Sequence, residues 1–140
     1  MFLGEYIHTI DQKRRLAVPA KFRKTLGKKA IIAPGLDNCL VIYPQEQWQK
    51  TAGKLENLPN GQVNARVFTR IMLSGANDVE LDTLGRILIP EHLKYYAQLK
   101  KNVAILGLSN RIEIWDQTKW KTYKEKMEKT VGDMAQQLGI

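Results

Sequence analysis

The sequence lacks the features on which several protein classes depend. One cysteine, Cys39, occurs among 140 residues, which excludes an intramolecular disulfide framework and fits a reducing compartment. The longest apolar stretches, at 30–33 and 103–106, are far shorter than the ~20 residues that a membrane-spanning helix needs. The N-terminal segment has no basic start and no small-residue cleavage site, so we expect no secretory signal. These absences favour a cytoplasmic protein without a membrane partner.

Signals of catalysis and metal binding are equally sparse. His8 and His92 occupy non-equivalent places and lack the cysteine or carboxylate spacing of a metal site. No glycine-rich phosphate loop or Gly-x-Ser-x-Gly motif occurs, and Cys39 is most simply a buried, unreactive thiol. Asp11 and Asp82 could form a carboxylate pair, but no base, metal site or nucleophile accompanies them. We therefore expect no enzyme, no catalytic residue, no cofactor, no metal and no small-molecule substrate.

Positive charge is what the sequence has in excess. Lys and Arg number 22 against 14 Asp and Glu, a net charge of +8, of which residues 1–70 carry +7 and residues 71–140 carry +1. The segment from Lys13 to Lys29 contains eight basic residues and no acidic one. Such a concentrated charge favours a polyanion, either nucleic acid or an anionic membrane surface, although an isolated run of this kind is often only a solvated face.

The chain also contains an internal repeat. The segment Asp11–Pro19, DQKRRLAVP, matches Asp82–Pro90, DTLGRILIP, at a shift of 71 residues. Further along, the shift becomes 72 and pairs GLDN at 35–38 with GLSN at 107–110. This ordered set of matches indicates a tandem duplication of a unit of about 50 residues, which is too small to bury a stable core alone. We therefore expect two intertwined units related by a pseudo-twofold axis.

Each unit predicts the same order of elements. A strand leads to the aspartate, a turn runs to the arginine, and a β-rich run follows at 16–18 or 87–89. Pro19 and Pro90 suit the first position of a short helix, after which two strands flank a Gly/Asn turn. Longer helices are expected from about residue 45, from 62 to 73, and from Asp116, which is a good N-cap.

The predicted fold is therefore mostly β with flanking helices, an α+β class. We expect a first unit at 1–52, a helical connector at 53–73, a second unit at 74–122 and a C-terminal helix at 123–140 that continues from the second unit. The apolar stripes on the longer helices, such as Trp120, Tyr123, Met127 and Met134 on the last one, indicate core or subunit contacts.

The repeated polar feature is an aspartate and an arginine four residues apart across a tight turn. In a structural interpretation, the aspartate accepts backbone N–H bonds and the arginine pairs with it. In a functional interpretation, the arginine also projects outward, where a guanidinium suits guanine O6 and N7 or phosphate. The first unit has more cations than Asp11 can neutralise, whereas Leu84 and Gly85 leave Arg86 with less local support, so we expect polyanion binding to favour the first unit. The candidate DNA-binding residues are Asp11, Lys13, Arg14, Arg15, Lys21, Arg23, Lys24, Asp82 and Arg86.

The two nine-residue motifs, together with IEIWD at Ile112–Asp116, resemble the MraZ family of bacterial proteins over essentially the whole chain. The resemblance implies two AbrB-like (SpoVT-type) swapped-hairpin units that form one double-split β barrel with helices outside. It also implies a ring-shaped homo-oligomer that binds short G-rich direct repeats in double-stranded promoter DNA. Such proteins are nucleoid-associated regulators, usually repressors, of the division and cell-wall gene cluster that includes their own gene.

The resemblance maps the DNA-reading motif onto residues 11–15 and 82–86. The family's usual turn has glycine before the arginine, as at Gly85, but the first unit has Arg14 there. If this position requires a positive φ, Arg14 is strained.

Two other functions fit parts of the sequence. An antitoxin-like or assembly protein could present its last helix, with Trp120 and Tyr123, to a protein partner. Its tail is mixed in charge and amphipathic, whereas such antitoxins usually have one unit and a disordered acidic tail. An RNA-binding protein would need exposed, repeated aromatic residues for base stacking, which the repeat does not supply.

Overall fold

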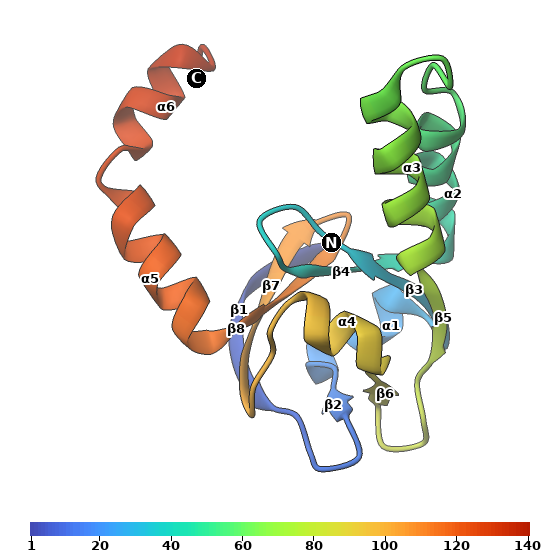
Figure 1. Cartoon of the computed structure of the whole chain (residues 1–140). Coiled ribbons are helices and arrows are strands. Elements are labelled where there is room, and N and C mark those ends of the chain that lie inside the picture. The colour runs from blue at the N-terminus through green and yellow to red at the C-terminus, as the bar shows by residue number, and fades with distance from the viewer.

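The computed structural model describes all 140 residues and shows two copies of one pattern of strands and helices (Figure 1). The first copy contains β1 (Phe2–Thr9), β2 (Arg15–Ala17), α1 (Ala20–Leu26), β3 (Lys29–Pro34), β4 (Leu40–Pro44), α2 (Gln45–Glu56) and α3 (Val63–Gly75). The second contains β5 (Asn77–Glu80), β6 (Arg86–Leu88), α4 (Glu91–Tyr96), β7 (Asn102–Ser109), β8 (Ile112–Asp116), α5 (Gln117–Glu128) and α6 (Val131–Gln137). The sequence repeat is therefore a structural repeat.

The first strand of each unit pairs with the other unit. The main sheet has six antiparallel strands in the order β1-β7-β8-β4-β3-β5, so β1 lies beside β7 and β5 lies beside β3. Strands β2 and β6 form a separate two-stranded ribbon. The expected α+β class with swapped strands is confirmed. The single double-split barrel that the family resemblance implies is not closed here, since β2 and β6 form a sheet separate from the six-stranded one.

One core lies between the six-stranded sheet and the ribbon. Alternate residues of the central strands, such as Ile32 of β3 and Ile105 of β7, enter a cluster of 20 buried residues. Leu16 and Ile87 close this cluster from the ribbon, while α1 and α4 cover its sides with residues that include Phe22. Burial of each large side chain contributes about 1.5–3 kcal/mol. Both units contribute residues to this one core.

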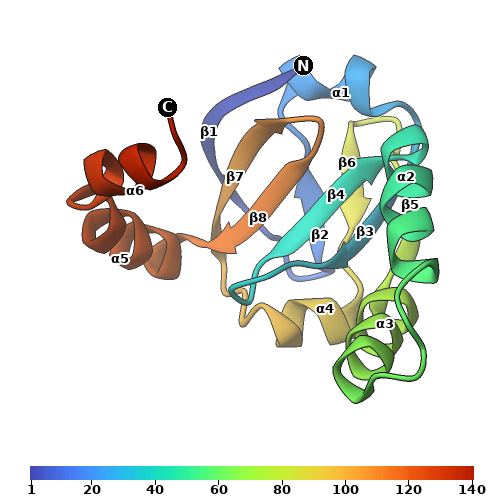
Figure 2. The same cartoon turned by 90° about the horizontal axis from the view of Figure 1, so that it is seen from above.

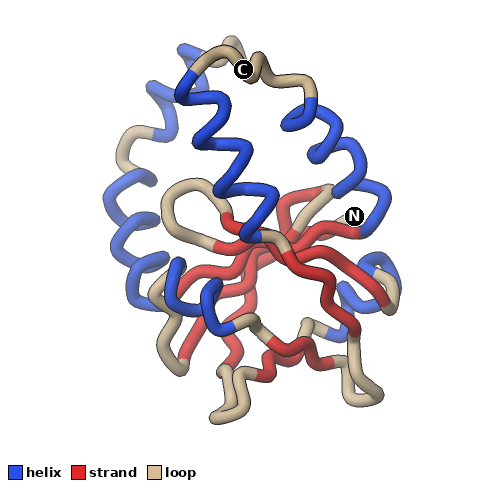
Figure 3. Tube along the Cα trace, turned by 45° about the vertical axis from the view of Figure 1, so that its right-hand side comes forward, coloured by secondary structure: helices blue, strands red, loops and turns tan.

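Helices α2, α3, α5 and α6 lie on the opposite face of the sheet from the ribbon (Figure 1). Seen from above, α2 and α3 lie toward the β5 edge of the sheet, and α5 and α6 lie toward the β1 edge (Figure 2). Figure 3 shows both pairs rising from the strands while the turns of the ribbon point the other way. We call α2 with α3 the first arm and α5 with α6 the second arm.

Several helix boundaries differ from the expectation. Asp116 caps α5 as predicted, since its side chain accepts a bond from the Lys119 N–H, but the single expected helix is divided into α5 and α6. The Thr130 hydroxyl donates to the Met127 carbonyl at 3.0 Å, a local bond that competes with helical continuation. Pro19 and Pro90 are the N-cap residues of α1 and α4 rather than their first helical residues.

Candidate nucleic-acid interface

The two Asp–x–x–x–Arg turns have the same backbone hydrogen bonds. Asp11 Oδ1 accepts from the N–H of Lys13 at 2.9 Å and of Arg15 at 2.8 Å. In the second turn, the corresponding Asp82 oxygen accepts from Leu84 at 2.9 Å and Arg86 at 2.8 Å. The N–H of each aspartate also donates to the carbonyl of the arginine four residues later. Each aspartate therefore holds its turn in one conformation.

The arginine of each turn is tied to the same aspartate through one nitrogen. Arg15 Nε donates to Asp11 Oδ2 at 2.6 Å, and Arg86 Nε donates to Asp82 Oδ2 at 2.8 Å. The backbone N–H of each arginine, reinforced by its guanidinium, lowers the pKa of the partner carboxyl below its ordinary value. About a third of each arginine side chain is exposed, at 35% and 29%. An exposed ion pair adds little stability, so the main effect is to orient the guanidinium.

The ribbon places both arginines on one exposed side. In its register, Arg15 lies opposite Leu88 and Arg86 lies opposite Ala17, on either side of the buried pair Leu16 and Ile87. Successive side chains of a strand point to opposite faces, so both arginines point away from the core. The ribbon lies far from both arms (Figure 1). A two-stranded antiparallel ribbon of this kind fits the major groove of B-DNA.

The residue before each arginine has a positive φ. Gly85 has φ 75° and Arg14 has φ 62°, so the strain expected at Arg14 is present. A left-handed conformation costs a non-glycine residue roughly 1–2 kcal/mol. Arg14 also makes a contact that glycine cannot make, because its Nε donates to the Ile89 carbonyl at 3.1 Å.

Helix α1 of the first unit lies at the turn of the second unit. Arg23 Nε donates to the Val18 carbonyl at 2.9 Å, and a Cβ added at Gly85 would collide with the Arg23 guanidinium. Lys24 lines the same shallow hollow as Asp82. The expectation that Arg86 has less local support than the arginine of the first turn is therefore wrong. The expectation considered only the sequence neighbours of Arg86. The strand swap brings basic residues of the first unit to the turn of the second.

The same swap adds basic residues that the sequence reasoning missed. Lys28 lines the hollow beside Asp82, and Lys94 of α4 lines the corresponding hollow beside Arg14. Lys94 is the counterpart of Arg23 at the shift of 71 residues, which could have identified it. Of the remaining candidates, Lys13 lies in the first turn, and Lys21 is exposed on α1.

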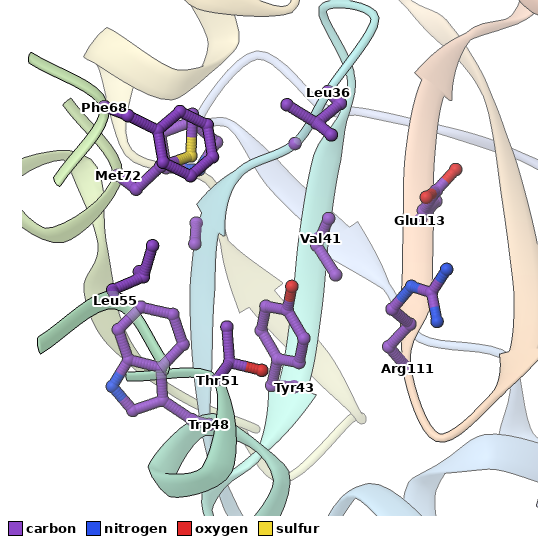
Figure 4. Close-up of a pocket in the computed structure, with 13 residues that line it drawn as sticks. Leu36, Val41, Tyr43, Trp48, Thr51, Leu55, Phe68, Met72, Arg111 and Glu113 are labelled. Atoms are coloured by element: carbon purple, nitrogen blue, oxygen red, sulfur yellow. The ribbon is translucent and has the colours of Figure 1, made fainter. Parts of the chain in front are cut away.

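A pocket of about 310 Å³ lies between the first arm and the sheet (Figure 4). Its lining is largely apolar, with Trp48, Phe68 and Met72 facing the hollow, and its charged residues are Arg111 and Glu113. No group of three His, Cys, Asp or Glu residues is placed to hold a metal ion. No helix is both long and apolar enough to span a membrane.

Cys39 lies outside this pocket's lining and is fully buried. Burial, together with the charges of Glu113 and Asp37, raises the pKa of its thiol to about 12. The thiol is therefore protonated at neutral pH, and the interpretation of Cys39 as unreactive agrees with its environment.

The fold and the duplicated turn define a tandem swapped-hairpin protein with two Asp–x–x–x–Arg turns on one ribbon. The family model described as "MraZ protein, putative antitoxin-like" matches residues 1–71 and 72–137, one match to each unit. The chain belongs to the MraZ family.

Curated relatives named "Transcriptional regulator MraZ" match nearly the whole chain. The relative from Natranaerobius thermophilus is 46% identical over 138 residues, covering 99% of this chain and 96% of the relative. That from Desulfitobacterium hafniense is 48% identical over 138 residues, with the same coverage. The Moorella thermoacetica relative is 50% identical over 123 residues, covering 88% of this chain and 86% of the relative. The family is thus one of transcriptional regulators, which suggests a role other than catalysis.

Proposed function

We propose that this protein is a sequence-specific, double-stranded-DNA-binding transcriptional repressor that places its β2–β6 ribbon in the major groove. The observation that carries the proposal is the state of four arginines at the ribbon, Arg14, Arg15, Arg23 and Arg86. Each donates its Nε–H to an oxygen of the chain, and none of their terminal amino groups has a protein partner. These groups are preoriented donors, so little side-chain entropy is lost when they meet an anion or a base edge.

In this proposal the candidate residues have three roles: reading bases, holding the turns and neutralising phosphates. Arg15 and Arg86, on the exposed side of the ribbon, read base edges, and guanine O6 and N7 are the acceptors that best match a guanidinium. Asp11 and Asp82 hold the turns and keep both arginines in place. The surrounding cations neutralise phosphates and set the register on the duplex; they are Lys13, Arg14, Lys21, Arg23 and Lys24.

The arms supply surfaces for a homo-oligomer. On α3 the side chains of Val63, Val67 and Ile71 are 66%, 44% and 48% exposed, although their spacing places them on one face. On α6, Val131 and Met134 are 54% and 38% exposed. A contact between α3 of one copy and α6 of the next covers both stripes, and a head-to-tail contact of this kind closes into a ring.

A ring matches the target that the family resemblance implies. Several copies of the ribbon would meet successive G-rich direct repeats, so that effective concentration strengthens contacts that are few for each protomer. We propose that these repeats lie in the promoter of the division and cell-wall gene cluster that includes the protein's own gene. The protein would then act in the cytoplasm, associated with the nucleoid.

Fluorescence anisotropy tests the proposal. The probe is duplex DNA from immediately upstream of the protein's own coding region, compared with a scrambled duplex across a salt series. We expect a clear preference for the native duplex and a log–log salt slope of about −0.9 for each phosphate contact. Equal, weak binding to both duplexes would contradict the proposal. An RNA duplex of the same sequence serves as competitor, and displacement by RNA at equal concentration would favour an RNA-binding function.

A second candidate is an antitoxin-like or assembly function through protein contacts. The description of the matching family model and the exposed stripe on α6 favour it. Co-purification of a stoichiometric, different protein from the native cell would support this alternative. Recovery of only further copies of the same chain would support the homo-oligomer.

A further inference from the structure

Arg14 and Arg23 occupy different positions of the repeat but equivalent places in the structure. The shift of 71 residues relates Arg14 to Gly85 and Arg23 to Lys94, so neither arginine has an arginine counterpart. Arg14 Nε nevertheless donates to the Ile89 carbonyl at 3.1 Å, and Arg23 Nε donates to the Val18 carbonyl at 2.9 Å.

The two acceptors, Val18 and Ile89, are counterparts at the same shift. Their backbone N–H groups are equivalent too: Val18 N–H donates to the Gly85 carbonyl at 2.9 Å, and Ile89 N–H donates to the Arg14 carbonyl at 2.8 Å. Each residue thus bonds the opposite turn through its N–H and a guanidinium through its carbonyl. Both turns are fixed at the residue directly before the DNA-reading arginine.

The guanidinium has a different origin at each place. The guanidinium that bonds the Val18 carbonyl belongs to Arg23 of helix α1. It fits there because the turn residue, Gly85, has no side chain. The guanidinium that bonds the Ile89 carbonyl belongs to Arg14 of the turn itself. The helix residue that corresponds to Arg23 is Lys94. A Cβ at Gly85 would collide with the Arg23 guanidinium, so the place beside Val18 has no room for a side chain on the turn residue as well as for the arginine of the helix.

We propose that Arg14 and Arg23 are interchangeable positioning residues for DNA reading. A guanidinium bonded to each of these two carbonyls holds the adjacent turn, and with it Arg15 or Arg86, in the orientation that reads bases. Either the turn or the opposing helix can supply this group. Lysine does not replace it, because an ammonium that bonds the carbonyl leaves its other N–H donors free to rotate, whereas the planar guanidinium bonded through Nε fixes the direction of its terminal amino groups. The inference rests on the proposed function and extends it.

The test transfers the arrangement of one place to the other. Arg14→Gly gives the first turn the glycine of the second turn but leaves Lys94 on the helix. The double variant Arg14→Gly/Lys94→Arg then supplies the guanidinium from the helix, as Arg23 does over Gly85. Both variants carry one positive charge fewer than the wild type, so a difference between them does not reflect net charge.

We expect Arg14→Gly to weaken binding to the native upstream duplex about tenfold and to lower its preference over the scrambled duplex. The double variant should return to within about threefold of wild type in both respects. Arg23→Lys, which preserves net charge, should weaken binding like Arg14→Gly. Lys94→Arg alone should change nothing, because Arg14 already fills that place. Melting temperature and oligomer mass are measured in parallel, and we expect Arg14→Gly to change them little, since glycine relieves the positive φ.

Several results would overturn the inference. One is a double variant that binds as weakly as Arg14→Gly while the wild type still prefers the native duplex, and this result would leave the proposed function intact. Wild-type affinity in both Arg14→Gly and Arg23→Lys would also overturn it. A wild type without any preference would overturn the proposed function, and this inference with it.

Discussion

The two units are nearly identical at their turns and different in their arms. Each turn spans five residues, and one aspartate accepts the same three hydrogen bonds in both. The first arm, in contrast, buries Leu55 and Ala65, whereas no residue of α5 or α6 is buried. Local hydrogen bonds therefore reproduce the same turn wherever the few residues that make them recur. A helix takes its position from whatever it packs against.

The arms differ because different side chains fill equivalent spaces. In the first arm, Phe68 and Met72 of α3 reach toward the sheet and leave a hollow (Figure 4). At the second arm, the ring of Trp115 on β8 packs against Trp120 and Tyr123 of α5 at centroid distances of 5.2 and 4.9 Å. This aromatic cluster joins α5 to β8, while Val131 and Met134 of α6 stay exposed.

The largest expected effect comes from breaking one of the matched turns. Arg15→Ala should abolish preference for the native upstream duplex, since loss of the proposed bidentate base contact costs about 1–3 kcal/mol for each protomer and the proposed ring repeats the loss. Arg86→Ala should have a comparable effect, because the second turn has the same geometry and support from α1. Anisotropy titrations measure both variants, and size-exclusion chromatography checks that the oligomer persists. Unchanged affinity in Arg15→Ala would refute its assigned role.

The next largest effect is expected from charges placed on the two arms, which should weaken oligomer formation. Met134→Asp on α6 should dissociate the proposed oligomer, because it places a charge in the proposed apolar contact with α3, and should lower affinity for the native duplex by roughly 10²-fold through lost avidity. Ile71→Asp on α3 should do the same. The control is Gln136→Asp, which adds the same charge at an exposed polar position of α6. If mass measurements find Met134→Asp and Gln136→Asp in the same assembly as wild type, the arms do not form the contact.

A smaller effect is expected on the pH dependence of stability, which compares the two turns. Folding lowers the pKa of Asp11 and Asp82 from an ordinary value of 3.8, so their carboxylates stabilise the fold above that pH. This stabilisation is lost as the pH falls below 3.8 and through the lowered folded-state pKa. Asp11→Asn and Asp82→Asn should each weaken the dependence of the melting temperature on pH in this acidic range, and by similar amounts. A change in only one variant would show that the turns are energetically different.

The smallest effect is expected on α1. Lys24→Ala should weaken binding to the native and scrambled duplexes equally and reduce the log–log salt slope by about 0.9, as for one lost phosphate contact. Anisotropy at four or more salt concentrations measures the slope. Loss of preference for the native duplex would show instead that Lys24 contributes to base reading.

Much of the fold could be predicted from the sequence because its signals are local or repeated. The motif DQKRRLAVP and its second copy predicted the two turns, the ribbon strands and the short helices that follow. The division into α5 and α6 escaped prediction, because an apolar stripe across Thr130 looks continuous and the competing hydroxyl bond is a single local contact. The positive φ at Arg14 could be suspected only because Gly85 stands at the matching position.

The support that each turn receives was not predictable in the same way. Lys24 and Arg23 follow the first turn in the sequence, yet they lie at the second turn. The amino-acid sequence by itself determined the duplication, the basic excess and the Asp–x–x–x–Arg turns, since these depend on residues within a few positions of one another. Only the tertiary structure decided which helix serves which turn, because strand exchange pairs β1 with β7 and β5 with β3 and closes one core from both units.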